Sequence, residues 1–312
     1  METVPTYQFT ADDYKWLEHL QQEGYVVVKD VLSPEQVIEA RKLLWDGIED
    51  LVTGVKRDNL ETWEQWNLDR TGLIPELAQS EGQWFVRGVD KVKQVIAHIY
   101  QTQDLLVSMD AVLAWRPWRM NDHWKPVTEG LHLDQNPFSK PGFEVVQGMV
   151  PLYAVTTESG GLEVVPRSHT DAAKTQWKSR YPHMSLAGDW CPMHPNDPFY
   201  KQAVLLLAEA GDLVLWDSRT VHGGRVGSGK EDEKAVQLDR LSCTVSMTPA
   251  VRASTEVLRA RTLGFLSGQC FNHTPHEAGT SSGTLIAKKN SKYKPPKLSA
   301  HQMALLRGQN CS

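Results

Sequence analysis

Residues 130–137 read G-L-H-L-D-Q-N-P, a short segment bounded by glycine and proline. If this segment is a β-strand, its side chains alternate between the two faces, so His132 and Asp134 point the same way. The pair then offers two ligands to a metal ion. A third ligand is expected at His222, near the end of residues 213–224, L-V-L-W-D-S-R-T-V-H-G-G. Two imidazoles and one carboxylate on one face of an octahedral ion suit Fe(II) and leave positions open for chemistry.

The segment lies within a series of short strand patterns. From about residue 104, runs rich in β-branched and aromatic residues are separated by clusters of Gly, Pro, Asn or Ser, which is typical of strands joined by turns. We predict strands at residues 105–115, 131–134, 143–155, 161–166, 204–208, 213–216, 221–223 and 241–248. Eight short strands with few helices between them predict a double-sheet jelly roll of the cupin type. Residues 167–202 lack strand alternation and are predicted to form an insertion or a lid.

Helices are expected on either side of this core. Residues 33–36, S-P-E-Q, provide a hydroxyl cap, a proline in the first turn and an amide three residues after the cap, and apolar residues follow at helical spacing. Shorter helices are predicted at residues 10–24 and 89–100, with a β-branched run at 25–28. A further helix is predicted at residues 256–263.

The fold class is therefore mostly β with flanking helices. We expect a single domain over residues 1–312. Its parts are an N-terminal helical support (1–103), a jelly-roll core (104–250), and a C-terminal helix with a polar tail (251–312). A mobile tail is expected around the basic residues Lys288, Lys289, Lys292, Lys294 and Lys297.

Composition narrows the possible functions. The 312 residues are 23% charged and 40% hydrophobic with a net charge of −5, which argues against nucleic acid or an anionic membrane as the main partner. The four cysteines contain no C-x-x-C pair, so buried or idle thiols are expected. The N-terminus lacks a signal-peptide pattern, and no apolar stretch approaches the ~20 residues that span a bilayer. We expect a cytoplasmic protein; its oligomeric state is not indicated.

The motifs of the expected metal site also have other interpretations when each is considered alone. A second H-x-D, His169 and Asp171, follows a polar turn and is interpreted as a strand exit rather than a ligand pair. His222 is also a candidate for a hydrogen bond to a neighbour such as Asp217. The same three ligands would suit a zinc hydrolase, although the chain contains no H-E-x-x-H motif. A cupin-like binding protein without catalysis is a third reading.

An arginine begins the last predicted strand. If Arg240 shares the register of His222, its guanidinium enters the barrel, where it can bind a carboxylate through two parallel hydrogen bonds. Ser242 lies on the same face of that strand. Arg225, three residues after His222, is the competing carboxylate partner.

Four motifs in order identify a family resemblance. They are H-x-D at 132–134, E-S-G-G-L-E-V-V-P-R-S-H at 158–169, G-D-L-V-L-W-D-S-R-T-V-H-G-G at 211–224 and R-L-S at 240–242. Together they resemble the phytanoyl-CoA dioxygenase-like family of Fe(II)/2-oxoglutarate oxygenases. The N-terminal stretch 23–37, E-G-Y-V-V-V-K-D-V-L-S-P-E-Q-V, is also similar to the opening of that family. The resemblance covers roughly residues 15–250.

The resemblance implies a double-stranded β-helix that binds Fe(II) at His132, Asp134 and His222. It implies that 2-oxoglutarate chelates the iron and places its far carboxylate on Arg240. O₂ then oxidises a C–H bond of the substrate, and the cosubstrate is released as succinate and CO₂. Related halogenases lack the carboxylate ligand, so Asp134 argues against halogenation. Hydroxylation, desaturation and oxidative cyclisation remain open, and nothing in the sequence demands a CoA thioester.

The chain departs from the family pattern in two places. Many members carry the arginine closer behind the distal histidine, whereas residues 227–238 intervene here, which keeps Arg225 as an alternative. Members often carry a serine where this chain has Gly224, so one cosubstrate hydrogen bond is expected either to be missing or to come from Ser242 or Gln147. Gln135 and Gln147 are the predicted polar neighbours of the site.

Several candidates for contact with a small-molecule substrate lie just before the H-x-D strand. The cations there suggest an anionic or amino-acid-like metabolite. The candidates are Arg116, Arg119, Lys125, the aromatic residues Trp115, Trp118 and Trp124, and His273 in the C-terminal segment.

Overall fold

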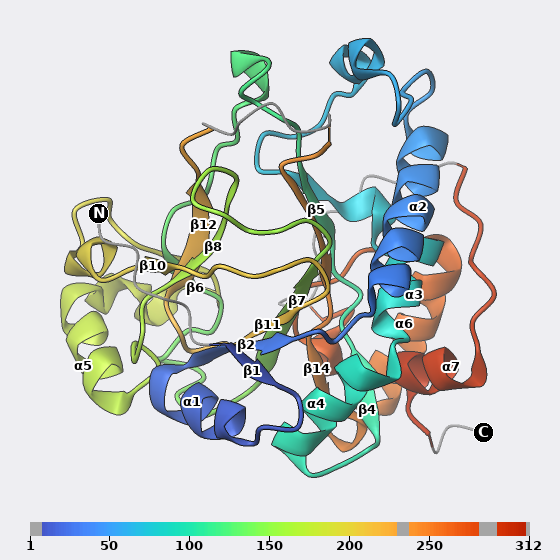
Figure 1. The fold of residues 1–312 in the computed structure, drawn as a ribbon. Helices are drawn as coiled ribbons and strands as arrows, with labels where there is room; N and C mark the ends of the chain where they lie inside the picture. Colours follow the sequence, from blue (N-terminus) through green and yellow to red (C-terminus); the bar gives the residue numbers. More distant parts are fainter. Residues whose placement is uncertain (1–7, 230–236, 281–291, 310–312) are drawn as a thin grey trace.

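The computed structural model describes residues 8–229, 237–280 and 292–309, whose strands form two facing sheets (Figure 1). The large sheet contains β1 (Gln8–Thr10), β2 (Tyr25–Lys29), β3 (Leu73–Ile74), β4 (Leu105–Val107), β5 (Val112–Trp115), β7 (Val146–Pro151), β11 (Leu213–Asp217), β13 (Arg240–Thr244) and β14 (Met247–Pro249). The small sheet contains β6 (His132–Leu133), β8 (Gly160–Val164), β9 (Cys191–Pro192), β10 (Val204–Leu205) and β12 (His222–Val226). Their orders are β1-β2-β11-β7-β13-β5-β3, with β4 and β14 joined at β7, and β10-β8-β12-β6-β9. The fold is a jelly roll with flanking helices, as predicted.

Apolar side chains of the large sheet alternate between its two faces, so both faces pack against other parts of the protein. In β11, Leu213 and Leu215 belong to the main core under the helices, whereas Val214 and Trp216 belong to a second cluster that includes residues of the small sheet. Every residue of this strand is buried. Because both faces are apolar, the few polar side chains that point between the sheets stand out as candidates for function.

Helices cover the outer face of the large sheet. They are α1 (Lys15–Glu23), α2 (Pro34–Leu51), α3 (Glu81–Arg87), α4 (Asp90–Tyr100), α6 (Thr255–Ser267) and α7 (Ala300–Arg307), while α5 (Asp171–Arg180) lies beside the small sheet (Figure 1). Helix α2 begins with the predicted capping box between Ser33 and Gln36, and α1 ends at Gly24 in the left-handed conformation. These caps satisfy main-chain groups that the helix ends leave free.

Several elements differ from their predicted bounds. The predicted strand 105–115 is divided into β4 and β5, and 241–248 into β13 and β14. Residues 167–202, predicted to form an insertion or a lid, contain helix α5 and strand β9, and helices α3 and α7 were not predicted. Helix α1 starts at Lys15, five residues after the predicted start at residue 10. Lys288 and Lys289 of the predicted tail lie outside the described residues.

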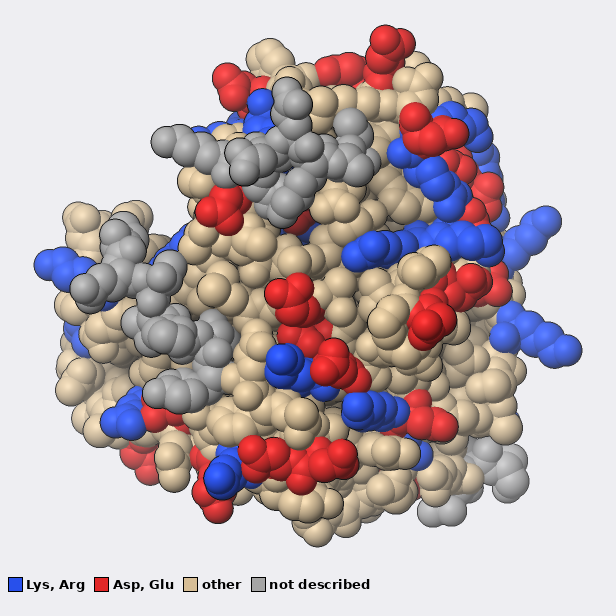
Figure 2. All heavy atoms as spheres, in the orientation of Figure 1, with Lys and Arg blue, Asp and Glu red and all other residues tan. Residues whose placement is uncertain are grey.

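Charge is distributed evenly on the face seen in Figure 2, where acidic and basic side chains are interspersed. This face therefore has no extended region of one sign among the residues drawn in colour. Three cysteines, Cys191, Cys243 and Cys270, are buried free thiols, as expected. No helix in the described part of the chain is long and apolar enough to cross a bilayer.

Candidate metal centre and cosubstrate site

The two candidate histidine ligands face each other across a strand pair. His132 of β6 is paired in register with His222 of β12, and their ring centroids are 4.6 Å apart. Each Nδ1 lies 2.9 Å from a main-chain carbonyl two residues earlier, that of Gly130 and that of Thr220. Because a carbonyl only accepts, each Nδ1–H donates, and each Nε2 keeps its lone pair for a metal. His222 does not hydrogen-bond to Asp217, which pairs with Arg219 instead.

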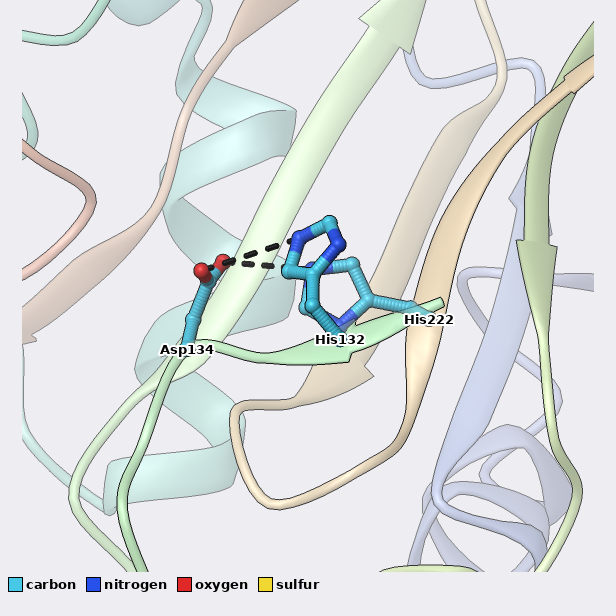
Figure 3. Close-up of side chains that lie close together, drawn as sticks. All are labelled: His132, Asp134 and His222. Carbon is cyan, nitrogen blue, oxygen red and sulfur yellow. Dashed lines mark ion pairs between the residues drawn. The ribbon is translucent and has the colours of Figure 1, made fainter. Parts of the chain in front are cut away.

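Asp134 completes the group (Figure 3). Its carboxylate oxygens lie 3.7 Å from Nε2 of His132 and 3.2 Å from Nε2 of His222. One ligand atom from each of the three residues lies within 4.8 Å of the others. Burial works to raise the pKa of Asp134, but His273, His132 and His222 outweigh it, so the pKa lies well below its usual value. Burial lowers the pKa of His132, which favours the neutral imidazole that a metal requires.

Two further side chains approach the same carboxylate. Gln147 of β7 donates from Nε2 to Oδ2 of Asp134 at 3.1 Å, and Nδ1 of His273 lies 3.7 Å from that oxygen. Gln147 is therefore placed to orient the carboxylate, a function that the neighbours of metal ligands commonly have. His273 comes from the segment after α6, far from the other site residues in sequence.

A cavity of about 180 Å³ opens over these residues. Its lining on the large-sheet side includes Trp115, Gln147, Met149, Trp216, Arg240 and Thr244, and it also contains the three candidate ligands.

The guanidinium of Arg240 enters this cavity without an anionic partner among the described residues. Its side chain is 5% exposed, stacks over Trp115 at 4.7 Å and contacts Sδ of Met149 at 3.4 Å. Its Nε and the Oγ of Ser242, which is 1% exposed, are buried without a hydrogen-bond partner. Burial lowers the pKa of Arg240 to about 10. A buried cation and a buried hydroxyl that both lack partners fit a dicarboxylate ligand such as 2-oxoglutarate.

The alternation of β13 explains this placement. Leu241 and Cys243 point into the core under the helices, so Arg240, Ser242 and Thr244 point to the other face. Arg225, the competing arginine, donates from Nε to Glu163 at 2.6 Å and from Nη2 to the carbonyl of Ala203 at 2.9 Å. Its guanidinium is therefore already paired, and it lies outside the lining of the cavity.

Gln135 is placed differently from the prediction. It is 2% exposed; its amide donates to the carbonyls of Lys140 and Gly142 and accepts from Ser218. It also lies outside the lining of the cavity. Its polar atoms thus fix the loop after β6 and are not available to a cosubstrate.

The predicted substrate-contacting cations also lie outside the cavity lining. Arg116 donates to the carbonyls of Trp63 and Trp66 at 2.9 and 3.0 Å, Arg119 pairs with Asp239 at 2.6 Å, and Lys125 lies over the ring of Trp118. The reason for expecting an anionic substrate is therefore absent. Among the predicted tryptophans, Trp115 lines the cavity, whereas Trp118 and Trp124 do not.

The second H-x-D is not a ligand pair. Nε2 of His169 lies 3.0 Å from the carbonyl of Gln21, and Asp171 is an exposed residue in the first turn of α5. The interpretation of His169 as the end of a strand region agrees with this position.

An ion cluster closes the loop that carries Asp134. Nζ of Lys140 lies 2.7 Å from carboxylate oxygens of both Asp189 and Glu277. These residues belong to the segment before β9 and to the C-terminal segment. The cluster therefore connects three parts of the chain around the site.

Sequence reasoning missed two carboxylates that line the cavity, Asp110 and Glu129. Asp110 is the lone acidic residue in the apolar run 105–115, L-L-V-S-M-D-A-V-L-A-W. A single carboxylate in such a run is a signal that could have identified it.

The jelly roll and its buried group of two histidines and one aspartate define the class of mononuclear non-haem iron enzymes. The sequence model of the phytanoyl-CoA dioxygenase family matches residues 20–230, about two thirds of the chain, and the protein belongs to this family. Its members use Fe(II), 2-oxoglutarate and O₂, so the protein is a 2-oxoglutarate-dependent non-haem iron oxygenase.

Individual relatives are more distant. The Ava biosynthesis cluster protein O of Aspergillus versicolor is 25% identical over 280 residues, which cover 84% of this chain and 86% of the relative. The epimerase SnoN of nogalamycin biosynthesis, solved with Fe³⁺, α-ketoglutarate and nogalamycin RO, is 18% identical with a TM-score of 0.48, over 76% of this chain and 83% of SnoN. EvdO2 of Micromonospora carbonacea var. aurantiaca, solved with 2-oxoglutarate, is 17% identical with a TM-score of 0.46, over 80% and 94% of the two chains.

Proposed function

We propose that this oxygenase oxidises a C–H bond of a small organic metabolite, with release of succinate and CO₂. In this proposal His132, Asp134 and His222 bind Fe(II). Arg240 binds the far carboxylate of 2-oxoglutarate, and Ser242 donates a further hydrogen bond to it.

The observation that carries the proposal is the buried guanidinium of Arg240. A charged group 5% exposed and without an anionic partner in the described chain is unfavourable unless a ligand neutralises it. A dianionic cosubstrate does so, and the same cavity contains the three metal-ligand candidates. A zinc hydrolase would leave this arginine without a function.

The protein contributes orientation and exclusion of water. The main-chain carbonyls behind His132 and His222 fix both rings, and Gln147 fixes the carboxylate of Asp134. Leu113, Met149, Leu162 and Trp216 place apolar surface in the same cavity, which limits the access of water to the reacting groups. Bound iron supplies the activation of O₂, which is chemistry that no side chain provides.

The substrate is proposed to be a biosynthetic metabolite. The relative from Aspergillus versicolor is named for a biosynthesis cluster. Hydroxylation, desaturation and oxidative cyclisation all begin with loss of a hydrogen from carbon, so one active site serves any of them.

The test is succinate formation from 2-oxoglutarate. We expect turnover that requires Fe(II) and O₂, rises with the correct metabolite, and is lost in His132→Ala and Asp134→Ala. His169→Ala is the matched control, because this histidine lies outside the site. Anaerobic addition of 2-oxoglutarate to the iron-loaded protein should produce a visible charge-transfer band. Zinc as the bound metal with hydrolytic activity, or tight ligand binding without O₂ consumption, would contradict the proposal.

A further inference from the structure

Two carboxylates of the cavity have no part in the proposed iron and cosubstrate sites. Asp110 is half-buried in the connection between β4 and β5, on the side of the large sheet. Glu129 is exposed at the rim, just before β6 of the small sheet. The two sheets therefore each place one acidic side chain beside the space where a substrate binds.

Neither carboxylate has a cationic partner within the described chain. Asp110 accepts a hydrogen bond from the N–H of Ala111 at 2.6 Å, and Arg87 donates to its main-chain carbonyl at 3.0 Å rather than to its carboxylate. Burial raises the pKa of Asp110 to about 6, although His273 opposes the shift. Burial and then Asp134 raise the pKa of Glu129. Neither group therefore forms a salt bridge within the described chain, although His273 and Arg87 act on Asp110 and His222 acts on Glu129 to lower the pKa.

The net charge of the site with iron and cosubstrate bound leads to the same conclusion. Fe(II) and Asp134 together carry one positive charge, and 2-oxoglutarate with Arg240 carries one negative charge, so the loaded centre is neutral. Beyond the two candidate histidine ligands, the lining that the structure describes contains one further histidine, His273, which lies 3.7 Å from Asp134, and no lysine or further arginine. Asp110 and Glu129 therefore leave a negative site beside a neutral metal centre, and a ligand of positive charge balances it.

We propose that the substrate of this oxygenase carries a basic nitrogen, protonated near neutral pH, that binds to Asp110. The exposed Glu129 attracts the cation toward the cavity, and the apolar wall formed by Leu73, Leu113 and Trp115 contacts its carbon skeleton. The contact with Asp110 sets which carbon faces the iron. This inference rests on the proposed function because it takes the cavity as the substrate site.

Binding of three matched probes tests the proposal without turnover. The probes are 2-phenylethylamine, 2-phenylethanol and 3-phenylpropionate, measured by ligand-observed NMR on the protein loaded with Zn(II) and 2-oxoglutarate. We expect the amine to bind about tenfold more tightly than the alcohol, as is typical of a charge-assisted hydrogen bond. Asp110→Asn should remove most of this preference, and Glu129→Gln should weaken its dependence on salt. Asp122→Asn removes the same charge from an exposed position outside the cavity and should change nothing.

Three results would overturn the proposal. They are equal binding of amine and alcohol, tighter binding of the carboxylate, and a preference for the amine that persists in a variant with both substitutions. Failure of every probe to bind counts as the first result. Binding of 2-oxoglutarate is measured separately from its charge-transfer band on anaerobic Fe(II) protein, and Asp110→Asn should leave it unchanged. Loss of that band in the wild type would overturn the proposed function, whereas a normal band with no amine preference would overturn only the substrate class.

Discussion

Replacement of Arg240 by methionine should stabilise the protein without cosubstrate and at the same time prevent cosubstrate binding. Burial lowers the pKa of this arginine from 12.5 to about 10, which corresponds to a cost of at most about 3 kcal/mol for keeping it charged. Loss of its stacking on Trp115 removes about 0.5–1 kcal/mol. The net gain in unfolding free energy is therefore about 2 kcal/mol, or a few degrees in Tm. Truncation of a buried partner of a carboxylate weakens binding by at least about 2 kcal/mol, roughly 30-fold.

A second buried arginine provides the matched control. Arg261 is fully buried and its pKa is lowered to about 9, but it donates to carbonyls of Leu306, Pro275, Val107 and Leu305 at 2.7–3.2 Å. Arg261→Met would leave these acceptors buried and unsatisfied, and each costs about 1–3 kcal/mol. It should therefore destabilise the protein, in the opposite direction to Arg240→Met.

Anaerobic thermal unfolding of the iron-loaded variants, with and without 2-oxoglutarate, measures both effects. The wild type should gain Tm as cosubstrate is added, because a ligand that binds only the folded state stabilises it. Arg240→Met should start higher and gain nothing. A lower Tm for Arg240→Met together with an unchanged response to 2-oxoglutarate would show that Arg240 is structural and would refute the reasoning.

Other residues give sharper or simpler outcomes. His132→Ala should fold but lose bound Fe(II), measured by metal analysis after dialysis. Gly223→Ala should lower the unfolding free energy by about 2 kcal/mol or more, since its Cβ would lie 2.5 Å from a main-chain oxygen. Gly224→Ala should cost less, because its Cβ would lie nearest to side-chain atoms, 2.9 Å from a methyl group of Thr128. Lys140→Met should lower stability by about 1 kcal/mol and increase hydrogen exchange in the segments that its ion pairs connect. Asp110, with its pKa raised from 3.8 to about 6, binds more protons folded than unfolded, so stability falls as pH rises through that interval. Asp110→Asn should remove this slope in urea unfolding and add at most about 3 kcal/mol at pH 7.

The sequence predicted those parts of the fold whose local pattern agrees with the tertiary structure. Strand β13 is an example. Leu241 and Cys243 alternate with Arg240 and Ser242, so the sequence predicted both the strand and the face on which its polar side chains lie. The capping box at Ser33 likewise identified the start of α2. Helix α7 begins with the same arrangement, Ser299 followed by Gln302, and that signal was available but was not used.

Helix α3 was not predicted because its packing against helix α2, rather than helix propensity, determines which residues it contains. The backbone of α2 passes so close to it that a Cβ on Gly82 would lie 2.7 Å from the backbone nitrogen of Leu44. A glycine in the first turn lowers helix propensity, yet here only glycine permits the two helices to pack. No window of the sequence by itself contains that information.

The residues of the candidate site also differ in whether a local sequence pattern could identify them. His132 and Arg240 could be selected from the sequence because each is polar at a position where strand alternation fixes its direction. Asp134 could be selected because it follows His132 by two residues, although it lies just past the end of β6. Asp110 lies in a connection, where no period fixes a direction, and the sequence analysis did not identify it. His273 also lies in a connection; it was named as a possible substrate contact, and the assembled cavity places it beside the metal ligands. What the five share is physical: each places charge or hydrogen-bonding capacity next to the same cavity. Arg240 has no anionic partner and Asp110 has no cationic partner. Each unpaired charge lowers the stability of the folded protein, and both lie in one cavity. Two ligands of opposite charge, a dicarboxylate on one side and a basic nitrogen on the other, account for both losses, and neither ligand alone does.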